Sequence, residues 1–208
     1  LAPVDRQEAW CSGVTYERSR AARVEEAVVK SAYDLVFEAE RPEVFMKAPA
    51  YRVPPPGAPL RVRGDSTWDV PEPELALVLT ADGEIAGYLV ADDISSRDIE
   101  GENPLYLAQA KIFDDALGLS DTIVLARDLG DRARSARIEL VIERAGETVF
   151  SGETSTAQMV RPFEQLAAFL FRELTHPHGA VLLTGTGLVP PDELTLEGGD
   201  TVQITIDG

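Results

Sequence analysis

Two short apolar runs in the middle of the chain are separated by an Asp-Gly pair. Residues 75–79 and 85–90 are rich in aliphatic side chains, and Asp82-Gly83 lies between them. Asp-Gly between two such runs is typical of a β-hairpin closed by a two-residue type I′ turn. We therefore expect a hairpin in which Ala81 pairs with Glu84 across the turn, and in which the pairing of the two strands continues outward from these residues.

Carboxylates gather at the open end of this expected hairpin. Counting outward from the turn places Glu72 opposite Asp93, and Pro73 opposite Asp92. Side chains alternate along a strand, so Glu74 shares a face with Glu72, about 6.6 Å away. A directly opposed side chain lies on the same face, with its Cβ roughly 4.5–5.5 Å away. The register thus predicts that Glu72, Glu74 and Asp93 form one patch, while Asp92 points to the other face.

Three carboxylates on one patch repel one another unless a cation lies among them. Ligands that are all oxygen suit Mg²⁺, with Mn²⁺ or Ca²⁺ as alternatives. The other interpretation is a solvated strand end that happens to be acidic, and a β-bulge anywhere in the hairpin would shift the register. The spacing alone leaves both interpretations open.

The rest of the chain consists of short apolar runs between Gly- and Pro-rich turns. Two or three helical stretches interrupt them, including residues 31–40 and 161–173, and the sequence has no internal repeat and no regular strand–helix alternation. This pattern predicts a mixed, mostly antiparallel α+β fold. Outside the hairpin, the expected strands are residues 9–16, 44–48, 60–63, 122–126, 137–144, 148–151, 180–183 and 201–206.

Composition and charge exclude several classes of partner. The 208 residues carry a formal net charge of -17 at pH 7, which argues against binding to nucleic acid or to anionic membranes. No apolar run approaches the ~20 residues of a membrane span, and no signal-peptide pattern opens the chain. The single cysteine, Cys11, excludes an internal disulfide and fits a reducing compartment, so we expect a cytoplasmic protein. We interpret Cys11 as a buried thiol rather than a nucleophile.

The 208 residues are enough for one large domain or two small ones, and the Pro-rich segment at residues 54–57 is typical of a rigid loop rather than of a domain linker. The chain stops inside a strand-like run at its C-terminal end. We therefore expect residues 1–208 to form one catalytic domain of a longer protein, with a smaller region before residue 1 and further chain after residue 208.

Two lysines and one turn are further candidates for chemistry. Lys47 and Lys111 each lie among apolar residues, where an amine could face developing negative charge or simply extend from the edge of the core. Residues 184–187 read Thr-Gly-Thr-Gly and lack the Gly-Lys-Ser/Thr of a P-loop. Such small residues let backbone N–H groups approach a ligand, and they suit a structural turn equally well.

Several motifs occur in the order in which the fumarylacetoacetate hydrolase superfamily carries them. That superfamily has E-x-E, then G-Y, then N-D-x-S/T-x-R-D. The chain is similar to it over nearly its whole length, with the corresponding elements Glu72-x-Glu74, Gly87-Tyr88, Asp92-Asp93-Ile94-Ser95-Ser96-Arg97-Asp98, Phe45-x-Lys47, Lys111-x-Phe113 and Thr184-Gly185-Thr186.

The resemblance implies a fold and a set of site residues. The implied fold is a mixed β-sandwich roll with a few short helices, which commonly forms homodimers or higher homo-oligomers. The implied metal ligands are Glu72, Glu74 and Asp93, the same three that the register predicts. Lys111 would face the developing oxyanion, and Thr186 would bind the substrate carboxylate. The remaining implied substrate-binding positions are Ser95, Lys47 and Arg97, of which Arg97 would brace the site through Asp98 or a neighbouring loop.

One departure from the superfamily pattern changes the expected reaction. Hydrolytic members carry G-x-N-Y-x-x-H-x-x-E, whose His-Glu pair activates water, whereas this chain has Ser19 and Ala22 at those two positions. With Gly-Val-Thr-Tyr-x-x-Ser at residues 13–19 and Glu-Gly-Glu-Asn-Pro-Leu-Tyr at residues 100–106, it resembles the sugar-acid branch, which includes the 2-keto-3-deoxy-D-arabinonate dehydratases.

The resemblance to this branch implies a metal-dependent lyase that dehydrates a 2-keto-3-deoxy sugar acid. Chelation by the metal would acidify the C3 proton, and the C4 hydroxyl would then leave as water. Glu25 or Glu26 is the expected acid/base. The alternatives are an acylpyruvate- or fumarylacetoacetate-type hydrolase, an oxaloacetate-type decarboxylase, and a family member that binds a 2-keto acid without turning it over.

Overall fold

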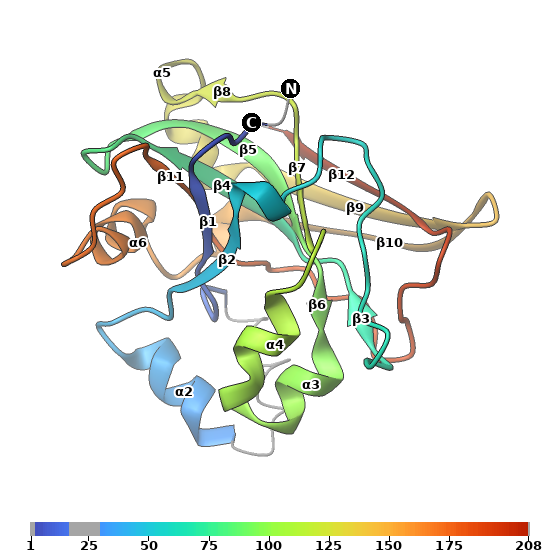
Figure 1. The fold of residues 1–208 in the computed structure, drawn as a ribbon. Helices are drawn as coiled ribbons and strands as arrows, with labels where there is room; N and C mark the ends of the chain where they lie inside the picture. The colour runs from blue at the N-terminus through green and yellow to red at the C-terminus, as the bar shows by residue number, and fades with distance from the viewer. Residues whose placement is uncertain (1–2, 17–29, 208) are drawn as a thin grey trace.

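The computed structural model describes residues 3–16 and 30–207, in which strands predominate and helices are short (Figure 1). The largest sheet has the strand order β2-β1-β11-β4-β5-β7, and β8 pairs with β5. Of its paired strands, β1 and β11 run parallel and the others antiparallel. The bounds are β1 Glu8–Cys11, β2 Phe45–Pro49, β4 Pro73–Leu79, β5 Ile85–Asp93, β7 Leu117–Leu119, β8 Val124–Leu125 and β11 Ala180–Leu183.

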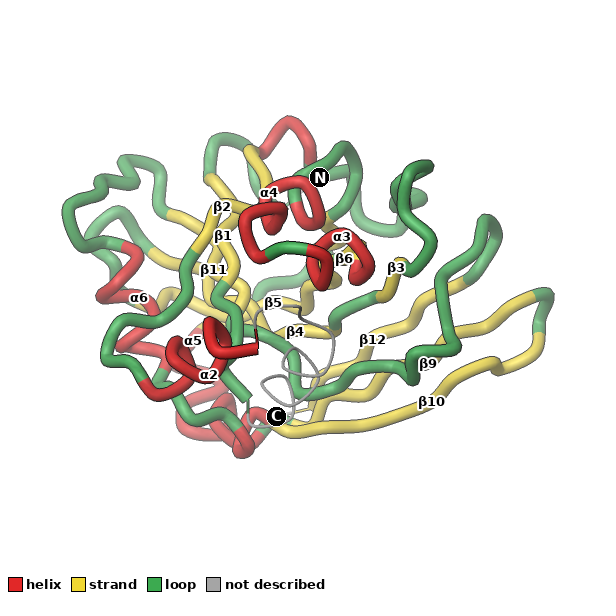
Figure 2. The backbone as a smooth tube through the Cα atoms, turned by 90° about the horizontal axis from the view of Figure 1, so that it is seen from below, coloured by secondary structure: helices red, strands yellow, loops and turns green. Residues whose placement is uncertain are grey.

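Two smaller sheets complete the described strands. The order β10-β9-β12 forms a three-stranded sheet that extends to one side of the molecule (Figure 2). A two-stranded ribbon pairs β3 with β6. The bounds are β3 Asp69–Val70, β6 Ser95–Ser96, β9 Arg137–Arg144, β10 Glu147–Ser155 and β12 Thr201–Asp207.

The helices are short and lie around the sheets. Because Phe163, Leu166 and Leu170 follow helical spacing, α6 buries one apolar face against the large sheet. None of the helices in the described part of the chain is long and apolar enough to cross a membrane. The α-helices are α2 Lys30–Glu38, α3 Arg97–Glu102, α4 Leu107–Lys111, α5 Ala126–Leu129 and α6 Phe163–Leu170; the 3₁₀ turns are η1 Ala50–Arg52, η2 Pro104–Tyr106, η3 Gly130–Ser135 and η4 Thr156–Gln158.

The β4–β5 hairpin has the predicted register at its open end but not at its turn. Pro73 pairs with Asp92 and Leu77 with Tyr88, as the count from a two-residue loop requires. The turn instead spans three residues, because the Thr80 N–H donates to the Glu84 carbonyl at 2.9 Å. Gly83, the last of the three, has φ +82°. The register shifts back between Val78 and Leu79, so the bulge cancels the extra loop residue before the strands reach the carboxylates. The prediction of a type I′ turn was therefore wrong, while the pairing that matters for the site is confirmed.

The two faces of this hairpin enter different cores. Leu75 and Leu77 point toward α6, in a cluster that also contains Leu166. Ala76 and Leu89 point to the opposite face, where they pack with β1 and β11. The residues of β4 and β5 that continue this second face toward the open end are Glu74, Ala91 and Asp93. The carboxylate patch is thus an extension of a buried core face.

Several predicted elements differ in the structure. The predicted strand at residues 60–63 is a loop, and the strand expected over residues 9–16 ends at Cys11. The strand expected over residues 122–126 is reduced to Val124–Leu125. By contrast, β9 and β10 meet at Ala145-Gly146 as predicted, with positive φ at both positions.

Candidate metal centre

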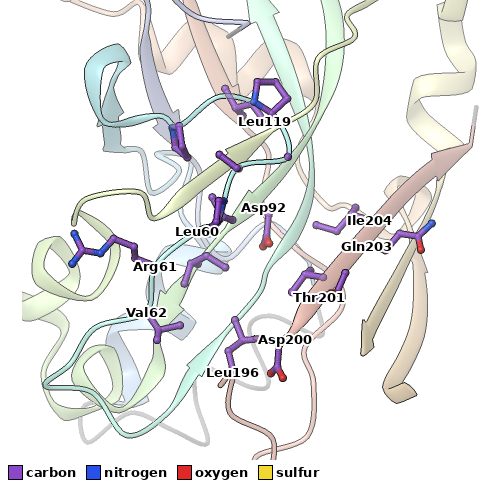
Figure 3. A pocket seen from close by; sticks show the side chains of 18 of the residues that line it. Leu60, Arg61, Val62, Asp92, Leu119, Leu196, Asp200, Thr201, Gln203 and Ile204 are labelled. Carbon is purple, nitrogen blue, oxygen red and sulfur yellow. The ribbon is translucent and has the colours of Figure 1, made fainter. Parts of the chain in front are cut away.

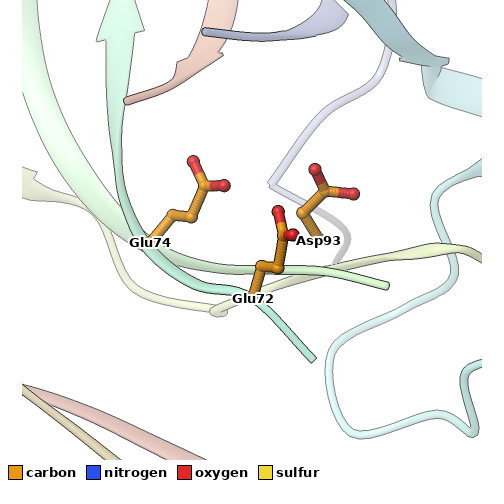
Figure 4. Close-up of side chains that lie close together, drawn as sticks. All are labelled: Glu72, Glu74 and Asp93. Atoms are coloured by element: carbon orange, nitrogen blue, oxygen red, sulfur yellow. The ribbon is translucent and has the colours of Figure 1, made fainter. Parts of the chain in front are cut away.

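Glu72, Glu74 and Asp93 come together in one buried cluster (Figure 4). Each offers a carboxylate oxygen that lies within 4.8 Å of the others, and the three residues are only 1–2 % exposed. The backbone of Asp93 donates to the carbonyl of Glu72 at 3.0 Å, which continues the hairpin ladder to this point. A buried set of three carboxylates has the donor chemistry of a site for a hard divalent cation, and the alternative of a solvated strand end is wrong.

Three buried cations lie against these carboxylates. The Lys111 amine is 2.6 Å from Glu72 Oε2 and 2.9 Å from Asp93 Oδ2. The Lys47 amine is 2.5 Å from Asp93 Oδ1, and Arg97 Nη2 is 2.8 Å from Glu72 Oε1. All three cationic side chains are no more than 1 % exposed. The interpretation of the lysines as extending from the edge of the core is therefore wrong, because both amines lie inside the carboxylate cluster.

Glu74 is held differently from the other two carboxylates. Within residues 3–16 and 30–207 it forms no ion pair, and its Oε2 accepts the backbone N–H of Gly185 at 2.6 Å. Gly185 has φ +93°, and a Cβ there would lie 2.1 Å from Thr15 Oγ1, so the position requires glycine. Burial and the charges of Asp93 and Glu72 raise the pKa of Glu74. A divalent cation bound to the three carboxylates would lower this pKa.

Cys11 is the buried thiol that the sequence predicts, and it also contacts the site. Its Sγ donates to Asp93 Oδ2 at 3.4 Å. Burial, together with the charges of Asp93 and Glu74, raises the pKa of the thiol well above its ordinary value. Cys11 therefore acts as a neutral hydrogen-bond donor in this structure rather than as a thiolate.

A wide groove lies on the other side of the hairpin from the carboxylates. This groove, of about 1020 Å³, lies between the loop at residues 54–62 and β12, with Asp92 in its wall (Figure 3). Asp92 faces away from Asp93, as predicted, and burial raises its pKa to about 8. A small cavity lies at the carboxylates themselves and is lined by Cys11, Ser12, Gly13, Val14, Phe45, Glu72, Glu74, Asp93, Lys111, Gly185 and Thr186. We take this cavity as the candidate site, because the charged side chains converge there.

The predicted substrate-binding residues lie at or beside this cavity, and their roles stay predictions. Thr186 lines it, but its hydroxyl bonds to the backbone N–H and carbonyl of Leu188. The Ser95 hydroxyl donates to the Asp93 carbonyl at 3.1 Å and accepts from Lys111 at 2.5 Å. Arg97 braces the site directly through Glu72 rather than through Asp98, whose carboxylate bonds to Ser66 and Thr67. The predicted acid/base residues Glu25 and Glu26, and the departures at Ser19 and Ala22, lie outside the described residues.

Sequence reasoning missed three contacts at the site. It did not predict the Gly185–Glu74 hydrogen bond, the Lys47–Asp93 ion pair or the contact of Cys11 with Asp93. The Thr-Gly-Thr-Gly run was a signal for the first, since it predicts a close backbone approach. The other two join segments 82 and 46 residues apart, so no local pattern contains them.

The chain belongs to the family described as fumarylacetoacetate (FAA) hydrolase C-terminal, whose model matches residues 8–208. It is 48% identical over 206 residues to a probable 2-keto-3-deoxyxylonate dehydratase of Haloferax volcanii, a match that covers 99% of this chain and 71% of that protein. It is 41% identical over 208 residues to a 2-dehydro-3-deoxy-D-arabinonate dehydratase of Saccharolobus solfataricus, covering 98% of this chain and 70% of the relative.

Solved structures agree with this membership. A 2-keto-3-deoxy-D-arabinonate dehydratase complexed with magnesium and 2,5-dioxopentanoate superposes with a TM-score of 0.89 at 40% identity, over 98% of this chain and 70% of that one. The predicted superfamily and its mostly-β fold are thereby confirmed.

Proposed function

We propose that this protein is a Mg²⁺-dependent hydro-lyase that dehydrates a 2-keto-3-deoxy sugar acid of the pentonate type. The names of its relatives support the substrate class, and the magnesium and 2,5-dioxopentanoate bound to one of them support the chemistry. The single observation in this chain that carries the proposal is the charge balance of the buried cluster.

The cluster has no net charge of its own. Glu72, Glu74 and Asp93 contribute three negative charges, and Lys47, Lys111 and Arg97 contribute three positive charges. A divalent cation therefore leaves the six side chains and the ion with a charge of +2. A 2-keto acid carries one negative charge, and its enolate carries two. These six side chains and the ion are consequently better matched to the enolate than to the substrate, which favours proton abstraction at C3.

The carboxylates would hold the cation, whose chemistry is to chelate the keto acid and stabilise negative charge on its keto oxygen. Lys111 keeps the oxygens of Glu72 and Asp93 at fixed positions, and its amine is a donor beside the oxygen on which charge develops. Lys47 holds the other oxygen of Asp93, while it also donates to the carbonyls of Ile94 and Lys111. These buried contacts orient the ligands before substrate binds. Glu25 or Glu26 remains the proposed acid/base.

The proposed reaction balances as the loss of one water. The C3–H bond and the C4–O bond of a 2-keto-3-deoxy pentonate break, and the proton and hydroxide leave together as water. The remaining C5 alcohol then tautomerises to an aldehyde, which gives 2,5-dioxopentanoate. This compound is the ligand that accompanies magnesium in the structural relative.

The test is a product assay on the full chain with Mg²⁺ and three kinds of acid. We expect 2,5-dioxopentanoate to form from a 2-keto-3-deoxy pentonate, as followed by NMR, and activity to be lost in Glu74→Gln or in EDTA. The Arg137→Met variant, which changes an ion pair far from the cluster, should retain activity. Cleavage of an acylpyruvate, or CO₂ release from oxaloacetate, without dehydration would refute the proposal in favour of the hydrolase or decarboxylase reading. Binding of pyruvate without any turnover would favour a non-catalytic member.

Three finer expectations belong with this proposal. The ion is Mg²⁺ rather than Mn²⁺ or Ca²⁺, because three carboxylates leave room for the water and substrate oxygens that Mg²⁺ retains. We further propose a homodimer or higher homo-oligomer and a cytoplasmic location. The superfamily resemblance supports the oligomer, and the single cysteine supports the compartment.

A further inference from the structure

The backbone at Val14 is strained beside the metal centre. Val14 has φ +53°, in the left-handed region that a β-branched side chain rarely adopts, and it is only 3 % exposed. A conformation of this kind is strained and persists only where the surrounding structure enforces it. Strain held in a cavity wall therefore points to a role for that wall.

The chain on both sides of Val14 is fixed by hydrogen bonds. Ser12 N–H donates to the Leu183 carbonyl at 2.9 Å. Thr15 Oγ1 donates to the Thr184 carbonyl at 2.6 Å, and the Thr15 carbonyl accepts Val160 N–H at 2.9 Å. Since these partners lie on strand β11, on the turn that follows it and on the segment before α6, the loop cannot relax without breaking bonds to the body of the protein.

Val14 separates the metal cavity from helix α2. On one side it lines the cavity together with the three carboxylates. On the other side it packs in a small apolar cluster with Tyr33, Val36 and Phe37 of α2. The C-terminal end of α2 is itself tied down, because Arg161 Nη2 donates to the carbonyls of Val36 at 2.7 Å and Ala39 at 2.8 Å. The wall therefore has a rigid backing, and a larger side chain at position 14 must extend into the cavity.

We propose that Val14 is a specificity-determining residue that limits the length of the keto acid beyond its metal-chelated end. The inference rests on the proposed function for the location of the chelated end. Among the described residues, the rest of the lining is charged, polar or small, so Val14 and Phe45 are the branched and aromatic apolar parts of the wall. Of these two, Val14 is the one whose position is enforced against backbone strain.

The experiment compares the native protein with Val14→Ala and Val14→Leu on a five-carbon and a six-carbon 2-keto-3-deoxy acid, with Mg²⁺. We expect Val14→Ala to move the ratio of kcat/KM toward the six-carbon acid by about tenfold, and Val14→Leu to move it the opposite way, since one methylene changes discrimination by roughly 10–200-fold. The overturning result is an unchanged ratio in both variants.

A binding series separates this inference from the proposed function. Pyruvate, 2-oxobutanoate and 2-oxopentanoate are titrated with Mg²⁺ by calorimetry, and Val14→Ala should strengthen binding of the longest acid relative to pyruvate. If the native protein dehydrates nothing but the length preference shifts as expected, the proposed function fails and the role of Val14 stands. If dehydration occurs and the Val14 variants show an unchanged chain-length preference in both assays, the role of Val14 is refuted and the proposed function stands.

Two further variants control for folding and for backbone strain. Val14→Gly adopts φ +53° without steric cost, so it preserves the path of the loop while removing the wall, and it should shift the preference at least as far as Val14→Ala. Ala145→Gly relieves the same φ of +53° in an exposed hairpin turn and should leave the ratio unchanged. A shift in the Ala145 variant as large as in the Val14 variants would contradict the inference, because strain relief rather than the wall would then be the cause.

Discussion

The two faces of the β4–β5 hairpin place neighbouring aspartates in opposite electrostatic surroundings. Asp93 is 1 % exposed and lies against the amines of both Lys47 and Lys111. Asp92 is 7 % exposed, lines the groove on the other face, and has an Oδ1 with no hydrogen-bond partner among the described residues. Burial alone therefore does not define a site. What distinguishes the metal face is that buried cations contact Glu72 and Asp93, and that a backbone N–H is donated to Glu74.

The largest expected effect comes from removing a cation on the metal face. Lys111→Met leaves Glu72 and Asp93 buried without their shared amine, and should lower the free energy of unfolding of the metal-free protein by about 3–5 kcal/mol. Urea unfolding in EDTA measures this loss. Mg²⁺ should then stabilise the variant more than the native protein, because the ion replaces part of the missing positive charge. Equal stabilisation of the two proteins would show that the partners of Lys111 do not hold the metal.

A smaller effect of opposite sign is expected on the groove face. The pKa of Asp92 is raised from 3.8 to about 8, so the folded state holds the proton more tightly than the unfolded state. The metal-free protein should therefore lose stability as the pH rises from about 4 to about 8, and Asp92→Asn should remove that dependence. At pH 8 the Asp92→Asn variant should be more stable than the native protein by on the order of 2–3 kcal/mol. This is about half of the value obtained from ~1.4 kcal/mol per pKa unit, because water in the open groove weakens the effect of burial.

The measurement for Asp92→Asn is urea unfolding in EDTA at pH 5 and pH 8. Only the difference between the two pH values tests the claim, since a change common to both reports packing of the amide. Parallel pH dependence in the variant and the native protein would mean that Asp92 is solvated or paired in solution.

The smallest effect tests whether burial, rather than pairing, makes Lys111 important. Arg137 on β9 also contacts two carboxylates, with Nη2 2.5 Å from Glu139 and 2.6 Å from Glu153, but its side chain is 50% exposed. Arg137→Met should lower the urea midpoint slightly at low salt and not at all at 0.5 M NaCl, because exposed ion pairs are screened. A loss of stability that persists at high salt and approaches that of Lys111→Met would contradict the claim that burial makes Lys111 more important than Arg137.

The sequence alone determined the metal face of the hairpin. Alternation along a strand and the pairing rule place Glu72, Glu74 and Asp93 together and turn Asp92 away, and the structure has this arrangement. The prediction succeeded even though the turn was wrong, because the bulge between Val78 and Leu79 cancels the third loop residue. The extra loop residue shifts the pairing by one position and the bulge shifts it back, so the register at the site is the one that was predicted.

Tertiary structure decided the features that depend on distant segments. The positions of Lys47 and Cys11 against Asp93 follow from the packing of β1 and β2 beside the hairpin, which no local spacing encodes. The left-handed backbone of Val14 is likewise imposed from outside, by bonds to residues 183, 184 and 160, against the preference of a β-branched residue. Local periodicity thus predicted which side chains share a face. Only the assembled fold decided which charges are neutralised and which wall is held under strain, because both depend on contacts between segments far apart in the chain.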